Sequence, residues 1–183
     1  MKTIVSFALA TILFTSFTAC KKTKQKIDEL TEFDINYSTD LSLPSASFTP
    51  VGTSTVASAD FNTPEIPTDM TSKLNGANTA TDKVSEIKLS KFNVTTTNNF
   101  NWMKSIKIYI SGNNQGESQL ATKLSVPANG ASSLDLDLND INLKNYLFGS
   151  SFKLRVTAEV VIPYASQDIK MNQTMHVKAT LLN

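Results

Sequence analysis

Apolar and polar residues alternate along much of the chain, and this pattern is typical of β-strands that have one buried and one solvated face. The longest runs cover residues 33–43, 152–162 and 169–181. Shorter runs cover residues 106–110 and 134–138, where isoleucine or leucine occupies every second position. Each run predicts a strand that packs one face on a core and turns the other toward water.

The segment 84–97 breaks this alternation in its middle. Ile87 and Leu89 occupy odd-numbered positions, whereas Phe92 and Val94 occupy even-numbered ones. A single extra residue in one strand would bring all four side chains to the same face. We therefore predict one strand here, with a β-bulge near Ser90-Lys91.

Two weaker strands are expected at residues 55–61 and 118–126. In the second of them, Leu120, Leu124 and Val126 are the positions expected to face the core. Stretches rich in Gly, Asn, Pro and Ser separate the runs, which is typical of turns between strands. The spacing predicts an antiparallel structure in which successive strands are connected by short loops.

Two short segments favour helices. Asp69 could cap a turn within residues 68–76, which ends at Gly76, and Asn139 or Asp140 could cap residues 139–147. Together these patterns predict an all-β fold, namely an antiparallel two-sheet β-sandwich of the Ig-like or Greek-key type. It would have about eight strands and one or two short crossover helices; a small barrel is the alternative.

Composition narrows the possibilities further. The chain has 183 residues, which suits one domain. Its single cysteine and single histidine exclude an internal disulfide framework and a His-rich metal centre. A formal net charge of +1 argues against nucleic acid as the main partner. We predict no cofactor and no metal site.

The first twenty residues have the features of an export signal. Lys2 gives a positive start, residues 4–17 are predominantly apolar, and small residues precede Cys20. The apolar run is shorter than the roughly 20 residues that a membrane-spanning helix needs. One interpretation of these features is an ordinary secreted protein with a free cysteine near its N-terminus.

The residues Phe17-Thr18-Ala19-Cys20 resemble the lipobox of bacterial lipoproteins, although Phe17 stands where that motif usually has leucine. The resemblance implies that residues 1–19 are removed as a signal peptide. It also implies that Cys20, the lipidation site, becomes the first mature residue and carries lipid on its sulfur and its amine. Two or more acyl chains would hold the protein stably on a membrane, since each buried CH₂ contributes about 0.8 kcal/mol.

Residues 20–30 are expected to form a tether between the lipid and the domain at 31–183. Residues 21–26 contain four lysines, which favours an extended, solvated segment. These lysines could contact anionic lipid headgroups or serve only as a spacer. Because 12 of the 17 basic residues and all 16 acidic residues follow residue 26, residues 27–183 carry a net charge of −4.

Three groups of residues are candidates for chemistry. Phe100 and Trp102, with nearby asparagines, could stack on and hydrogen-bond a sugar, or could close one end of the core. His176 could serve a hydrolase together with a serine and an acid, although no Gly-x-Ser-x-Gly elbow is present. The acidic residues of 135–140 partly match a calcium loop, but the interleaved leucines favour a strand. We predict no catalytic residue.

Beyond the signal, the pattern resembles small envelope lipoproteins of the Bacteroidota that join a lipidated cysteine and a short spacer to one β-sandwich. The resemblance implies a non-enzymatic outer-membrane lipoprotein that interacts with another envelope component. Some of these lipoproteins carry acidic residues just after the lipidated cysteine as a cue for export to the cell surface. No acidic residue precedes Asp28 in this chain, so the resemblance implies a protein that faces the periplasm. A glycan-binding module that uses Phe100 and Trp102 is the alternative, and a hydrolase that uses His176 is a third.

Overall fold

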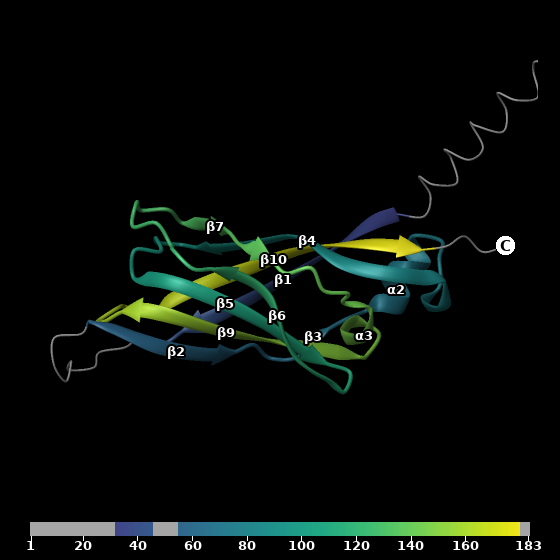
Figure 1. The fold of residues 1–183 in the computed structure, drawn as a ribbon, viewed down its shortest axis with the longest axis horizontal. Coiled ribbons are helices and arrows are strands. Elements are labelled where there is room, and N and C mark those ends of the chain that lie inside the picture. The colour runs from purple at the N-terminus through teal and green to yellow at the C-terminus, as the bar shows by residue number, and fades with distance from the viewer. Residues whose placement is uncertain (1–31, 46–54, 180–183) are drawn as a thin grey trace, which may run out of the picture.

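The computed structural model describes residues 32–45 and 55–179 and shows an all-β sandwich of two antiparallel sheets (Figure 1). The first sheet has four strands in the order β1-β10-β4-β7, and these are β1 (Glu32–Leu43), β10 (Gln167–Ala179), β4 (Val84–Thr96) and β7 (Ser133–Asp135). The signal peptide, Cys20 and the tether lie outside the described residues.

The second sheet has six strands. Its main order is β2 (Val56–Asn62), β9 (Ser151–Val161), β5 (Met103–Gly112), β6 (Gln115–Lys123) and β8 (Asp137–Leu138), and β3 (Ile66–Pro67) also pairs with β9. Within the described strands, β5 and β6 are the one pair of neighbours that follow each other in the chain. The chain therefore passes repeatedly from one sheet to the other, as Greek-key connections require.

Short helices close one end of the sandwich. They are α2 (Met70–Gly76), the 3₁₀ turn η1 (Thr81–Lys83) and α3 (Lys144–Leu147), and they lie at the end where β1 begins and β10 ends (Figure 1). Both helices fall within the segments predicted from sequence. The capping bonds expected from the sequence differ from those observed. Asp69 occupies the N-cap position of α2, but its side chain makes no capping hydrogen bond. At α3 the Asn142 side chain accepts a hydrogen bond from the Lys144 N–H. None of the described helices is long and apolar enough to cross a membrane.

The bulge predicted in β4 is present. Lys91 lies opposite Thr174 and Leu89 lies opposite Met175, which leaves Ser90 as the extra residue. The Ser90 hydroxyl donates a hydrogen bond to the Thr174 carbonyl (3.0 Å). Because of this one insertion, the apolar side chains on both sides of the bulge face the core.

The alternation predicted the wrong position for two leucines. Leu124 is 70% exposed, because β6 has a bulge at Leu120 that reverses the phase of the residues after it. Residues 134–138 were expected to form one strand, but β7 pairs with β4 in the first sheet and β8 pairs with β6 in the second. The chain changes sheets at Leu136, so Leu138 is 38% exposed.

The β5–β6 hairpin shows why its loop contains two asparagines. Asn113 and Asn114 have φ angles of 50° and 58°, the left-handed values that a type I′ turn requires at both central positions. Gly112, just before the turn, lies so close to β9 that a Cβ atom would be 3.0 Å from the Phe152 Cα. The turn expected at residues 111–116 therefore depends on two residues that tolerate left-handed φ angles and on a glycine that leaves room for β9.

Arg155 connects the strands on the solvated face of the second sheet. From β9 its guanidinium donates two hydrogen bonds to the Glu117 carboxylate on β6 and one to Asp60 on β2 (2.7 Å). Its Cζ atom also lies 4.5 Å from the centre of the Tyr109 ring on β5. These bonds to Arg155 lower the pKa of the Glu117 carboxyl from its ordinary value of 4.5.

Replacing Arg155 with lysine is expected to lower the melting temperature, because an ammonium cannot hold two carboxylates in the same fork geometry. The effect should be larger in low salt than in high salt. The contribution of Glu117 is complete above about pH 4.5, its unfolded value, and is lost as the pH falls through its lower folded-state pKa. Thermal melts followed by circular dichroism should therefore show the difference between the two proteins shrinking in acid.

The matched control is Lys153→Met. Lys153 also lies on β9 and pairs with a single carboxylate, Glu65 (3.3 Å), at a more exposed site. Its replacement should change the melting temperature less than Arg155→Lys does. An Arg155 effect that is independent of both salt and pH would show that the ion pairs contribute nothing to stability.

Candidate functional site

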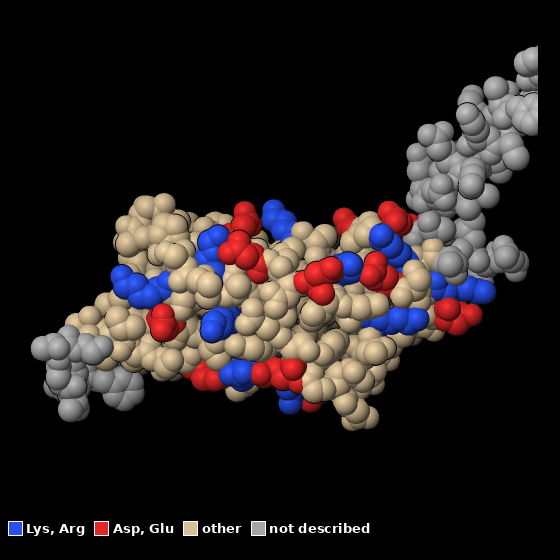
Figure 2. All heavy atoms as spheres, in the orientation of Figure 1, with Lys and Arg blue, Asp and Glu red and all other residues tan. Residues whose placement is uncertain are grey.

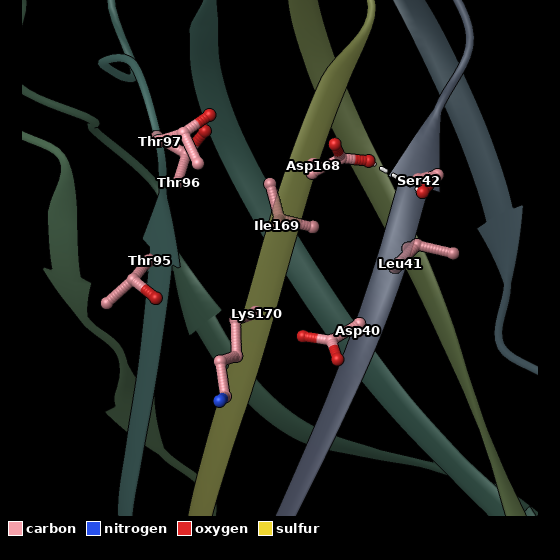
Figure 3. A pocket seen from close by; sticks show the side chains of 9 residues that line it. All are labelled: Asp40, Leu41, Ser42, Thr95, Thr96, Thr97, Asp168, Ile169 and Lys170. Carbon is pink, nitrogen blue, oxygen red and sulfur yellow. Dashed lines mark hydrogen bonds between the residues drawn. The ribbon is translucent and has the colours of Figure 1, made fainter.

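A hollow of about 490 Å³ lies on the solvated face of the first sheet, and we call it the basin; both polar and apolar groups line it (Figure 3). Three strands bring its residues together from distant parts of the sequence. The lining residues are Asp40, Leu41 and Ser42 on β1, Thr95 and Thr96 at the end of β4, Thr97 after it, and Asp168, Ile169 and Lys170 on β10. The basin therefore depends on the register of β10 with both of its neighbours.

The basin combines two carboxylates with one ammonium and several hydroxyls. The Ser42 hydroxyl donates a 2.6 Å hydrogen bond to Asp168, which is the dashed line in Figure 3. Asp40 and Lys170 are directly opposite each other in register, yet within the described part of the chain neither side chain makes a hydrogen bond or ion pair. In Figure 3 Lys170 lies between Asp40 and Thr95.

One hydroxyl of the basin is buried without a partner. The Thr96 Oγ1 atom is out of contact with solvent, and among residues 32–45 and 55–179 it has no hydrogen-bond partner. Buried polar groups are nearly always hydrogen-bonded, because each unpaired one costs about 1–3 kcal/mol. Thr96 lies opposite the buried Ile169 in the register of β4 with β10, so its hydroxyl faces the core side of the sheet and not the open side of the basin.

The opposite end of the same face is a network of acidic and basic side chains that includes His176. Its Nδ1 atom lies 2.9 Å from Asp34, and its Nε2 atom lies 3.4 Å from Glu32. Lys178, two residues along β10, also reaches Glu32 (3.8 Å). Because carboxylates engage both ring nitrogens, this arrangement does not place the imidazole to activate a serine, as the hydrolase hypothesis requires.

The acidic segment 135–140 does not converge on one point. Asp135 accepts a hydrogen bond from Asn93 (2.8 Å), Asp137 pairs with Lys123 (3.5 Å), and Asp140 pairs with Lys88 (2.8 Å). These carboxylates are spread over two sheets because the chain changes sheets between β7 and β8. No cluster of three or more His, Cys, Asp and Glu residues that could hold a metal occurs in the described portion.

Phe100 and Trp102 are parts of the core rather than of the surface. Phe100 is fully buried, and Trp102 is 9% exposed and stacks on Tyr164 with a centroid distance of 5.1 Å. Burial also raises the pKa of the Tyr164 hydroxyl. Neither Phe100 nor Trp102 presents a free ring face on which a sugar could stack. The geometry therefore favours the other interpretation, in which the two rings close one end of the core.

The two ends of the sandwich differ in charge. The loops beside the Trp102 plug contain no Asp, Glu, Lys or Arg, and we call them the uncharged end; they are residues 97–102, 124–132 and 162–166. The segments around the helices at the other end contain Asp69, Lys73, Asp82 and Lys144. Figure 2 shows a tan area at the upper left, whereas acidic and basic side chains occur elsewhere on this face, including its lower left.

Sequence reasoning did not find the basin. Its two carboxylates, Asp40 and Asp168, come from the beginning and the end of the domain's sequence, and each occupies an ordinary solvated strand position. Only the pairing of β1 with β10 places Asp168 beside Ser42. The available signal was the in-phase polar set on these two strands, which indicates a polar face but not which strands are neighbours.

Comparisons of the chain with models of known protein families and with curated proteins find no match. The basin, the plug and the uncharged end therefore have to be interpreted from their own geometry.

Proposed function

We propose that the protein is a lipid-anchored, non-enzymatic component of the cell envelope that presents its uncharged end to another envelope component. The proposal combines the lipobox-like sequence at Cys20 with the polarity of the sandwich. Glu32, the first described residue, lies at the helical end, and the uncharged end lies at the other end of the strands. A chain attached through its N-terminus would thus direct the uncharged end away from the point of attachment.

The distance between the two ends supports this orientation. β1 has 12 residues and runs the length of its sheet. At about 3.3 Å per residue it spans roughly 35–40 Å.

Amide and hydroxyl groups are common in the loops of the uncharged end, and desolvating them on contact costs less than desolvating charges. Such a surface suits a neutral, polar partner.

The anchor is tested by growing cells with an alkyne-tagged fatty acid. The wild-type chain is expected to incorporate the label and to fractionate with membranes, because Cys20 would carry the acyl chains. The Cys20→Ala variant should incorporate none. Mass spectrometry of the mature N-terminus should show residues 1–19 absent and Cys20 acylated; an unmodified thiol would refute the anchor.

The orientation is tested separately with a photo-crosslinking amino acid in intact cells. We would place it at Asn129 in the uncharged end and, as the matched control, at Thr71 on α2 at the helical end; both positions are exposed. A defined envelope component should be captured from position 129 and not from position 71. Equal capture from both positions would contradict a partner at the uncharged end.

A further inference from the structure

The basin differs from the other positions at which an acidic and a basic residue face each other across β1 and β10. Glu32 and Lys178 face each other across the two strands and are in contact (3.8 Å), as are Asp34 and His176 (2.9 Å). Asp40 and Lys170 occupy the third such position. In the described residues this is the pair whose side chains form no ion pair, and Thr95 is the residue opposite Lys170 on β4.

We propose that the basin binds a carbohydrate that has neighbouring hydroxyl groups and no acidic group. Asp40 and Asp168 can each accept hydrogen bonds from sugar hydroxyls, and bonds to a charged acceptor are about twice as strong as those between neutral groups. Lys170 can donate to sugar oxygens, and the hydroxyls of Thr95 and Thr97 can both donate and accept. These side chains thus offer donors and acceptors side by side, as neighbouring sugar hydroxyls do.

Size and charge define the class of sugar. A volume of about 490 Å³ falls within the range of roughly 300–1,000 Å³ typical of small-molecule sites. Two carboxylates against one ammonium give the basin a net charge of −1, which repels uronic acids and other acidic sugars. The preferred ligands are therefore neutral sugars, such as short segments of a neutral polysaccharide.

The basin places the sugar at a different position from the one suggested by the aromatic residues. Phe100 and Trp102 are buried, whereas Asp40, Asp168 and Lys170 are exposed on the open face of the sheet. No aromatic ring lines the basin, so hydrogen bonds must provide most of the affinity. We expect weak binding that requires millimolar ligand in solution and gains strength from repeated contacts with a polymer.

The test is saturation-transfer difference NMR on the purified full chain, with cellotetraose and chitotetraose as neutral probes and tetragalacturonate as the acidic one. At least one neutral probe should give a signal, and tetragalacturonate should give none. The variants Asp40→Ala and Asp168→Ala should each reduce the affinity at least tenfold. Asp34→Ala is the matched control, because it removes a carboxylate from the same face of β1 outside the basin.

All three variants replace exposed side chains, and thermal melts by circular dichroism should show that they remain folded. No signal from either neutral probe, equal binding of the acidic probe, or a signal that survives both basin substitutions would each overturn the proposal. Binding is measured on the isolated protein and does not depend on acylation of Cys20. A failure of the anchor and a failure of the sugar site are therefore distinguishable.

Discussion

Deleting Ser90 is expected to prevent the protein from folding. Ser90 is the extra residue of the bulge in β4, a central strand that pairs with β10 on one side and β7 on the other. Side chains alternate between the two faces of a strand, so removing one residue moves every side chain on one side of the deletion to the opposite face. Val84, Ile87 and Leu89 would then turn toward water.

The energetic cost is comparable to the whole stability of a typical domain. Exposing three buried aliphatic side chains costs roughly 1.5–3 kcal/mol each, or about 5–9 kcal/mol in total. The same change would turn Glu86 and Lys88 toward the core, where unpaired charges are costly. The native state of a domain is typically only about 5–15 kcal/mol more stable than the unfolded state.

The matched variant is Ser90→Ala, which keeps the number of residues and removes only the hydrogen bond from the hydroxyl to the Thr174 carbonyl. It should lower the free energy of unfolding by about 1 kcal/mol. Circular dichroism and urea denaturation should show cooperative unfolding for Ser90→Ala and none for the deletion. A deletion variant with wild-type stability would mean that the bulge does not determine the register of β4.

This bulge also shows how far local sequence determines the fold. The change of phase in β4 was visible because apolar residues lie on both sides of Ser90. The sequence gives no sign of the bulge in β6. Leu120 and Ala121 are both buried, but alanine is too small and too common at all positions to show that the alternation of buried residues has shifted by one. Leu124 was consequently expected in the core, and it is exposed.

Long-range features depended on information that alternation does not contain. The pattern of Leu134, Leu136 and Leu138 is compatible with one strand, but the chain passes to the other sheet at Leu136. Likewise the pairing of β1 with β10, which creates the basin, joins residues more than 120 positions apart. Periodicity predicts which face of a strand is buried, whereas the choice of neighbour depends on the packing of the whole sandwich.

Replacing Trp102 with alanine is expected to destabilise the protein by about 3–5 kcal/mol, the usual cost of removing a large buried aromatic side chain. The indole stacks on Tyr164 at 5.1 Å and lies 6.5 Å from Phe100, measured between ring centres. Its removal would leave a cavity beneath the uncharged end. The main-chain bond from the Val161 N–H to the Trp102 carbonyl does not depend on the side chain.

Trp102→Phe is the control that separates packing from polar recognition. Within the described residues the indole Nε1 atom is buried and has no hydrogen-bond partner, so phenylalanine removes an unsatisfied donor while it keeps an aromatic ring. The loss of volume and the gain from removing that donor oppose each other, and we expect a net change of only about 1 kcal/mol.

Urea denaturation followed by far-UV circular dichroism measures both variants without relying on tryptophan fluorescence. A large loss of stability for alanine and a small one for phenylalanine would establish Trp102 as a structural plug. If Trp102→Ala instead kept wild-type stability, the indole would contribute little to packing, and the aromatic glycan site would regain support. Because the basin and the plug use different residues, sugar binding in the basin should not depend on Trp102.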